Sequence, residues 1–238
     1  ARGNLQLGKD VDTADLNGDG LNDVTVDTRA QYEDNMEIFI FYNSTLMSQS
    51  ASTPLSSQEA DAIIYKEFRY DFLHNMEERV QSVGDVNSDG FADLAIAGVT
   101  SGFVVFGRSE FSDMEITDAD IVIQSGAEGR TLAVGIGNIG DVNGDNHIDL
   151  IFGEGTLLPA DAVLFYGPFN EPAVYDSSEI EDVRFIGDPE SDERYDVMRY
   201  LPDVTGDGVN DLLIGSPRHS GFSPDRGGIV YIVEGGRF

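Results

Sequence analysis

Acidic side chains recur along this chain at a spacing that suits a hard, oxygen-seeking cation. Four nine-residue segments, residues 15–23, 85–93, 141–149 and 203–211, carry oxygen-bearing side chains at positions 1, 3, 5 and 9. Calcium binds about six to eight oxygen atoms, and a tight loop whose alternate residues point inward can supply them. Position 6 is Gly in three segments and Asn146 in the other, and these residues most easily adopt the positive φ of a sharp turn. The pattern predicts four calcium-binding loops.

The segments around these loops have the composition of β-strands. A candidate strand leads into each loop, an apolar run follows it, and a second and a weaker third run come after gaps. The runs are short, rich in β-branched and aromatic residues, and bounded by Gly, Asp or Asn, as strands are. In chain order, strands are expected at residues 5–14, 24–26, 37–42, 62–68, 79–84, 94–96, 102–107, 121–123, 132–140, 150–152, 162–167, 183–186, 197–202, 212–214 and 228–233.

The regular spacing of the loops predicts a repeat protein. They begin on average about 63 residues apart, and four antiparallel strands per repeat describe the blade of a β-propeller. We therefore expect an all-β fold of about four blades, with repeats over roughly residues 1–70, 71–126, 127–188 and 189–238. The fourth repeat lacks a fourth strand, which predicts a piece of a larger propeller, or a propeller completed by another copy or another chain.

Composition excludes several classes of partner. The chain has 44 acidic and 14 basic residues, a net charge of −30, which argues against nucleic acid and anionic membrane surfaces. There is no cysteine, so no disulfide framework is expected. No apolar run approaches the ~18 residues that a membrane span requires, so no direct membrane insertion is expected.

Other readings of the motifs fit less well. An EF-hand would require an acidic residue at position 12, where this chain has Val26, Ile96, Phe152 and Ile214. The glycines of residues 135–140 match the dinucleotide pattern G-x-G-x-x-G, but they run into a loop of the acidic type instead of opening a helix. An inner strand close to a propeller axis explains them better. The three histidines are far apart in the sequence and form no catalytic motif.

The chain resembles the FG-GAP repeat proteins, the calcium-binding β-propellers of integrin α-subunit heads. The resemblance rests on the four loops, on the continuation after them, as in residues 211–215, and on Gly215-Ser216-Pro217, where the family has Gly-Ala-Pro. It implies up to four Ca²⁺ ions, held by side chains at positions 1, 3, 5 and 9 and by the carbonyl of position 7. The implied ligands are Asp15, Asn17, Asp19, Leu21 and Asp23; Asp85, Asn87, Asp89, Phe91 and Asp93; Asp141, Asn143, Asp145, His147 and Asp149; and Asp203, Thr205, Asp207, Val209 and Asp211.

The function expected from this resemblance is recognition outside the cell, without catalysis. Strand parity places the metal loops at one face of the propeller, so a protein or glycan partner is expected at the opposite face, over residues 27–36, 69–78, 153–159, 188–195 and 218–226. Two alternatives remain open. The chain could be a structural subunit of a surface assembly that neighbouring copies complete, or the propeller of a polysaccharide-processing enzyme.

Overall fold

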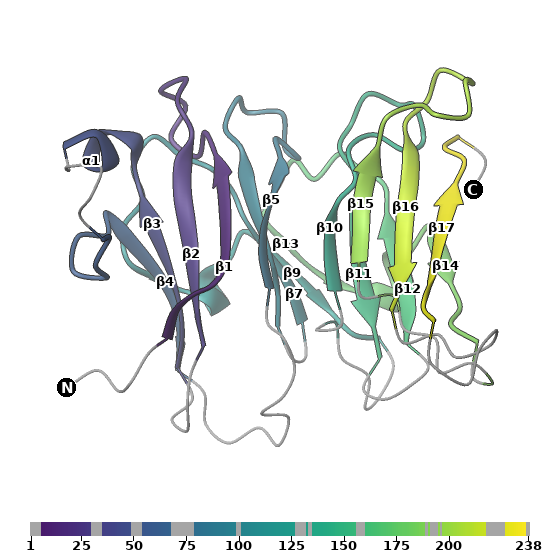
Figure 1. Ribbon diagram of the computed structural model, residues 1–238, viewed down its shortest axis with the longest axis horizontal. Coiled ribbons are helices and arrows are strands. Elements are labelled where there is room, and N and C mark those ends of the chain that lie inside the picture. The colour runs from purple at the N-terminus through teal and green to yellow at the C-terminus, as the bar shows by residue number, and fades with distance from the viewer. Residues whose placement is uncertain are drawn as a thin grey trace.

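The computed structural model describes most of the chain. The described residues are 6–29, 35–48, 54–67, 79–98, 101–126, 132, 135–155, 160–188, 190, 195, 197–217 and 227–236. They form an all-β fold of four sheets that stand side by side in a row (Figure 1). This arrangement is consistent with a β-propeller-like fold.

The sheets follow one another along the chain, and each takes most of its strands from one continuous stretch. Sheet 1 contains β1 (Gln6–Ala14), β2 (Asp23–Arg29), β3 (Asn35–Phe41), β4 (Ala62–Glu67) and β8 (Met114–Glu115). Sheet 2 contains β5 (Arg79–Gly84), β6 (Asp93–Ala97), β7 (Ser101–Val105), β9 (Ile121–Gln124) and β13 (Ala173–Asp176). Sheet 3 contains β10 (Gly135–Asn138), β11 (Leu150–Glu154), β12 (Asp161–Phe165) and β14 (Val183–Phe185). Sheet 4 contains β15 (Val197–Leu201), β16 (Asp211–Ser216) and β17 (Ile229–Val233). All fifteen predicted strands are present.

Two short strands were not predicted, and they extend the first two sheets beyond four strands. β8 pairs in parallel with β4, and β13 pairs in parallel with β9. Each comes from the connection between the third and fourth strands of the following repeat, so that connection covers the outer edge of the preceding sheet. A covered edge no longer offers a row of free backbone groups to other chains.

Three short helical segments were not predicted either. They are α1 (Asn43–Ser48), η1 (Ile116–Asp118) and α2 (Ser177–Ile180), and all three lie in connections between third and fourth strands. No helix in the part of the chain that the structure describes is long and apolar enough to cross a membrane.

Side-chain alternation along the strands gives each inner sheet two apolar faces. In β6, Leu94 and Ile96 join the core shared with sheet 1, whereas Ala95 and Ala97 join the core shared with sheet 3. This is the period of two that a strand buried on both faces requires. The innermost strands β1, β5, β10 and β15 are neighbours in that order. At Gly137 of β10, an added Cβ would lie 2.6 Å from the carbonyl oxygen of Met198, so a larger residue does not fit there.

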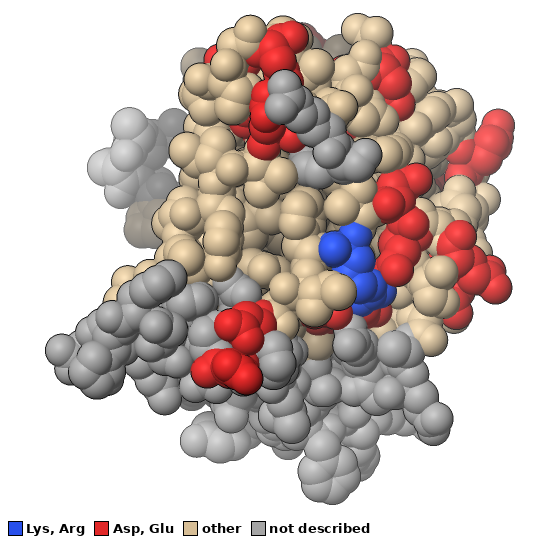
Figure 2. All heavy atoms as spheres, turned by 90° about the vertical axis from the view of Figure 1, so that its right-hand side faces the viewer, with Lys and Arg blue, Asp and Glu red and all other residues tan. Residues whose placement is uncertain are grey.

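The two ends of the row differ. The outer face of sheet 1 has a core of its own, in which Phe39 and Phe41 pack with Leu46 and Leu55 from the connection that contains α1. On sheet 4, the corresponding outer face leaves Val230 64% and Ile232 59% exposed. Figure 2 views this side and shows a broad area of uncharged residues, with scattered acidic side chains and a basic patch beside some of them.

Candidate metal centres

The four acidic loops connect the first two strands of their sheets and lie at the same edge of the row, the upper edge in Figure 1. Each begins within three residues of the end of the innermost strand and closes at the first residue of the next strand, or in the third loop at the residue before it. Because β1, β5, β10 and β15 are neighbours, the loops that follow them are neighbours too. The fold thus brings together loops that are about 60 residues apart in the sequence.

The carboxylate at position 1 organises each loop by accepting at least two backbone hydrogen bonds. In the first loop, Asp15 Oδ1 accepts from the Asp19 amide at 3.1 Å, and Asp15 Oδ2 accepts from the Gly20 amide at 2.9 Å. The same pair of bonds recurs at Asp85, Asp141 and Asp203. Position 6 has positive φ in all four loops, including 68° at Asn146, as the sequence predicted.

Position 3 continues this pattern in the first three loops and position 5 in all four. Asn17 Oδ1 accepts from the Asp19 amide at 3.0 Å, and Asp19 Oδ1 accepts from the Leu21 amide at 2.9 Å. Equivalent bonds form at Asn87 and Asn143. The side chains at positions 1, 3 and 5 therefore surround a common turn, although each oxygen retains lone pairs beyond those that these bonds use.

The aspartate at position 9 has a second role that the sequence reasoning missed. Asp23, Asp93, Asp149 and Asp211 are all 0% exposed. In the second loop, Asp93 Oδ2 accepts from the Val86 amide at 2.7 Å, and Asp93 Oδ1 accepts from the Gly107 amide at 2.8 Å. One carboxylate thus ties the start of the loop to the end of the third strand, and the other three aspartates make the equivalent two bonds.

Burial and neighbouring negative charge raise the pKa of three of these four aspartates. Desolvation raises the pKa of Asp93 to about 7 and that of Asp149 to about 6, and the other loop carboxylates add to each shift. The pKa of Asp23 is raised for the same reasons. At Asp211 desolvation also raises the pKa, but hydrogen bonds from Gly235, Val204 and Thr205 outweigh it and hold the pKa below its ordinary value.

The fourth loop differs from the others at position 3. Thr205 directs its hydroxyl to Asp211 Oδ1 at 3.1 Å and also donates its amide to Asp211 Oδ2 at 3.0 Å. In the other three loops, the Asn at this position contacts the aspartate at position 5 instead. The predicted ligand Thr205 therefore lies closer to position 9 than its counterparts do.

The donor set fits a hard dication in its chemistry. Each loop gathers carboxylate, amide or hydroxyl oxygens within nine residues, and oxygen is the ligand that Ca²⁺ prefers. In the first three loops the pKa of the aspartate at position 9 is raised mainly by burial and further by the neighbouring loop carboxylates, and a positive charge in the loop would favour the ionised form. Within the described residues, no group of three or more His, Cys, Asp or Glu is arranged to hold a metal ion.

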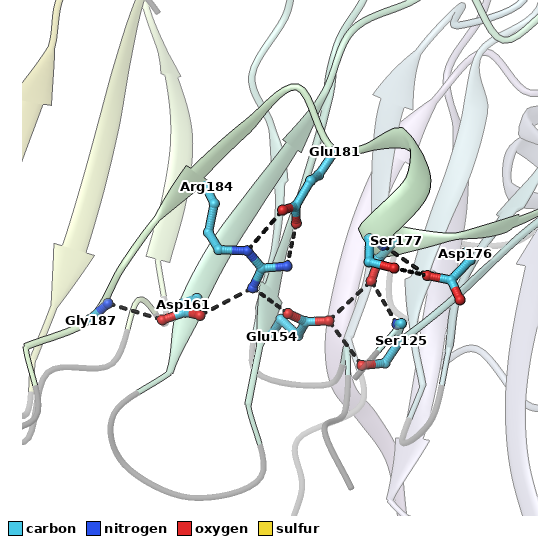
Figure 3. A network of polar contacts seen from close by, with 10 residues as sticks. Ser125, Glu154, Asp161, Asp176, Ser177, Glu181, Arg184 and Gly187 are labelled. Carbon is cyan, nitrogen blue, oxygen red and sulfur yellow. Dashed lines mark hydrogen bonds and ion pairs between the residues drawn. The ribbon is translucent and has the colours of Figure 1, made fainter. Parts of the chain in front are cut away.

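A second polar cluster, the Glu154 network, joins sheets 2 and 3 and was not foreseen (Figure 3). Glu154 is fully buried at the end of β11; its Oε2 accepts from Arg184 of β14, and its Oε1 accepts from Ser125 at 2.9 Å and from Ser177 at 3.1 Å. Arg184 also contacts Asp161 and Glu181. No motif marked these residues, because the network depends on strand pairing and on the path of the chain through β13 and α2.

Comparison with known proteins supports the resemblance seen in the sequence. Residues 201–233, which cover most of sheet 4 and the whole fourth loop, match the FG-GAP repeat family. The chain is also similar to integrin alpha-4 of Xenopus laevis, with 25% identity over 166 residues. That match covers 66% of this chain but only 15% of the integrin subunit. Together these matches support an FG-GAP/integrin-like family assignment.

Proposed function

We propose that this FG-GAP/integrin-like chain is a calcium-binding β-propeller module that acts outside the cell in adhesion or in recognition of a protein or glycan, without catalysis. One observation carries the proposal: the same acidic loop occurs four times, and in each copy the carboxylates at positions 1 and 9 accept the same backbone hydrogen bonds. A turn that only reverses the chain does not require three carboxylates in register. The similarity to an integrin α-subunit supports the adhesive role.

In this proposal the chain's own residues prepare each loop for the ion. Position 1 shapes the turn, position 9 anchors it to the third strand, and positions 3 and 5 supply further oxygens. The residue at position 7 turns its backbone into the loop, as shown by the Phe91 amide, which donates to Asp89 Oδ1 at 2.9 Å. When bound, Ca²⁺ supplies the positive charge that three close carboxylates lack. Binding is therefore linked to folding.

Isothermal titration with Ca²⁺ tests the metal sites, with Mg²⁺ as the comparison ion. We expect up to four calcium ions per chain and a rise in melting temperature. Asp19→Asn and Asp89→Asn should each remove one equivalent. Glu179→Gln, which removes an exposed acid outside the loops, should remove none. An unchanged stoichiometry in the two loop variants, or an unchanged melting temperature after chelation of the wild-type chain, would contradict the proposal.

The recognition surface is proposed at the edge of the sheets opposite the metal loops. Much of the predicted surface, including residues 69–78, 189, 191–194 and 218–226, lies outside the described residues. The described part of this edge carries buried acids such as Glu154 and Asp161, which pair across β11 and β12. A panel of glycans and extracellular-matrix proteins can be screened with the double variant Arg218→Glu/Arg226→Glu. Loss of calcium-dependent binding is expected, and unchanged binding would rule out this surface.

A second function, as a subunit of a larger assembly, is favoured by the exposed face of sheet 4. Leu213 occupies the position that Ala95 and Ile151 occupy in sheets 2 and 3, where these residues face the following sheet. Val230 and Ile232 are exposed on the same side as Leu213, so the face that packs at each earlier junction is open here. We propose a second copy of this chain as its occupant. Sedimentation equilibrium should show association that Ile232→Ser weakens, whereas a monomer at all concentrations would contradict this.

A further inference from the structure

Successive loops touch one another, and the contact at the first junction is specific. Phe91 occupies position 7 of the second loop, and its ring lies against Gly18 at position 4 of the first. A Cβ added to Gly18 would be only 2.6 Å from Cε1 of that ring. Gly18 has φ 72° and stands between the predicted ligands Asn17 and Asp19. The ring therefore supports the backbone that presents two of the first loop's oxygens.

Backbone hydrogen bonds reinforce this junction. The Ala92 amide donates to the Asp15 carbonyl at 3.0 Å, and the Arg108 amide donates to the Leu16 carbonyl at 2.9 Å. The first two carbonyls of the first loop are thus both held by the second repeat. One donor is the immediate neighbour of Phe91, and the other follows the third strand of the same sheet.

The junction between the third and fourth loops repeats this arrangement. Val209, at position 7 of the fourth loop, lies 3.3 Å from the place that a Cβ on Gly144 would take. Asn210 Nδ2 donates to the Asp141 carbonyl at 3.2 Å, and the Gly236 amide donates to the Val142 carbonyl at 2.8 Å. Although different residue types take part, the contacts fall at the same loop positions.

The second and fourth loops lack this contact with a glycine at position 4. At the middle junction, the Phe169 amide donates to the Val86 carbonyl at 3.2 Å, but position 4 of the second loop is Ser88 instead of Gly. At the fourth loop, a Cβ added to Gly206 would meet nothing within 4 Å. Packing of a position-7 side chain on a position-4 glycine is therefore seen at the first and third loops.

We propose that Phe91 and Val209 are positioning residues for cation binding in the loop before their own. This inference rests on the proposed calcium function. Neither side chain can bind calcium, but each holds the position-4 backbone of the preceding loop in its turn, and a preorganised site binds more tightly than a loose one. The same residue contributes its backbone to its own loop. Occupancy of the second loop therefore strengthens binding in the first, and the coupling is reciprocal.

Truncation of the ring tests this in the full chain. Phe91→Ala keeps the backbone carbonyl of the second loop but removes the support of the first, so we expect calcium affinity of the first loop to fall on the order of five-fold or more. Val174→Ala is the control, because it truncates an apolar side chain that lies in β13, outside the four loops, and is 67% exposed. This control should leave the calcium affinity of all loops unchanged. Phe91→Leu, which retains apolar bulk, should give an intermediate loss.

A double-mutant cycle that combines Phe91→Ala with Asp19→Asn shows whether the effect belongs to the first loop. Titration calorimetry should show that Phe91→Ala weakens binding in the wild-type background but changes nothing once Asp19→Asn has disabled the first loop. In chelator, amide exchange at Gly20 should be faster in Phe91→Ala than in Phe91→Leu, which retains apolar bulk at position 7 of the second loop. An equal loss in both backgrounds would overturn the coupling alone. A wild-type chain that binds no calcium would overturn both the coupling and the calcium function.

Discussion

Substitution of Arg184 by Met should expose the electrostatic role of the Glu154 network. Arg184 is the single guanidinium among three carboxylates: Glu154, Asp161 and Glu181. Met keeps the length and apolar bulk of the side chain but removes the charge. The result for Glu154 is a fully buried carboxylate that keeps the hydrogen bonds from the Ser125 and Ser177 hydroxyls but loses the guanidinium charge beside it.

The size of the effect follows from burial. Removal of one partner from a buried ion pair costs about 3–5 kcal/mol, because the other charge is left desolvated. The side chain of Arg184 is 22% exposed, whereas that of Glu154 is 0% exposed. Water can therefore reach the site of the removed guanidinium but cannot solvate the Glu154 carboxylate directly. We expect a destabilisation of about 2–4 kcal/mol at pH 7. Glu181→Gln, at a 26% exposed side chain, should cost about 0–1 kcal/mol.

The pH dependence distinguishes lost charge pairing from lost packing. Burial by itself raises the pKa of Glu154, but Arg184, Ser125 and Ser177 outweigh that effect and hold the pKa below its ordinary value of 4.5. In the wild type this carboxylate contributes stability that is present above pH 4.5 and is lost as the pH falls through the lowered pKa. Without Arg184, desolvation dominates and the pKa rises above 4.5. The loss of stability relative to wild type should then be largest at neutral pH. It should become smaller as the pH falls toward 4.5 and Glu154 takes up a proton.

Urea denaturation followed by circular dichroism measures these differences at a fixed calcium concentration. The double variant Arg184→Met/Glu154→Gln should be less destabilised than the sum of its single variants by about 1–3 kcal/mol. A deficit of Arg184→Met that is the same at pH 4.5 and pH 7 would refute the electrostatic explanation. So would strict additivity in the double variant.

Three further predictions concern the loops and the exposed face. Gly18→Ala should destabilise the chain more than Gly206→Ala: both glycines have positive φ, which costs an alanine about 1–2 kcal/mol, but only the Cβ at Gly18 would also strike an aromatic ring. Thermal melts in chelator measure the difference, and equal costs would contradict the loop contact. Asp93→Ala should cost about 2–3 kcal/mol even without calcium, because the Val86 and Gly107 amides lose their acceptor; a chelated variant as stable as the chelated wild type would show that the anchor is dispensable. Val230→Ser should leave the melting temperature within a few degrees of wild type, since Val230 is 64% exposed; a large fall would show that its face is covered in solution.

Much of the fold could be predicted because strands and loops leave local signatures. The runs that became β6, β11 and β16 were recognisable from β-branched and apolar residues directly after an acidic loop. The additional strands β8 and β13 were not recognisable, because their pairing partners belong to the preceding repeat. The position of Gly137 against Met198 shows why an inner-strand interpretation of residues 135–140 suited them better than a nucleotide site.

The candidate site divides in the same way. The positions of the loop oxygens could be predicted, since they lie within nine residues of one another. The anchoring of Asp93 by Gly107 and the support of Gly18 by Phe91 could not, since these partners are 14 and 73 positions apart in the sequence. Such contacts depend on how the chain crosses from one sheet to the next.

The sequence by itself determined the repeat, its strands and the chemistry of four oxygen-rich loops, because alternation along a strand and the turn at position 6 are properties of neighbouring residues. Only the tertiary structure decided which loops touch, which sheet edges are covered, and that Glu154 and Arg184 meet between sheets 2 and 3. Those outcomes depend on the packing of one repeat against the next. Side chains such as Phe91 and Arg184 acquire their roles only when residues distant in the chain are brought within contact distance.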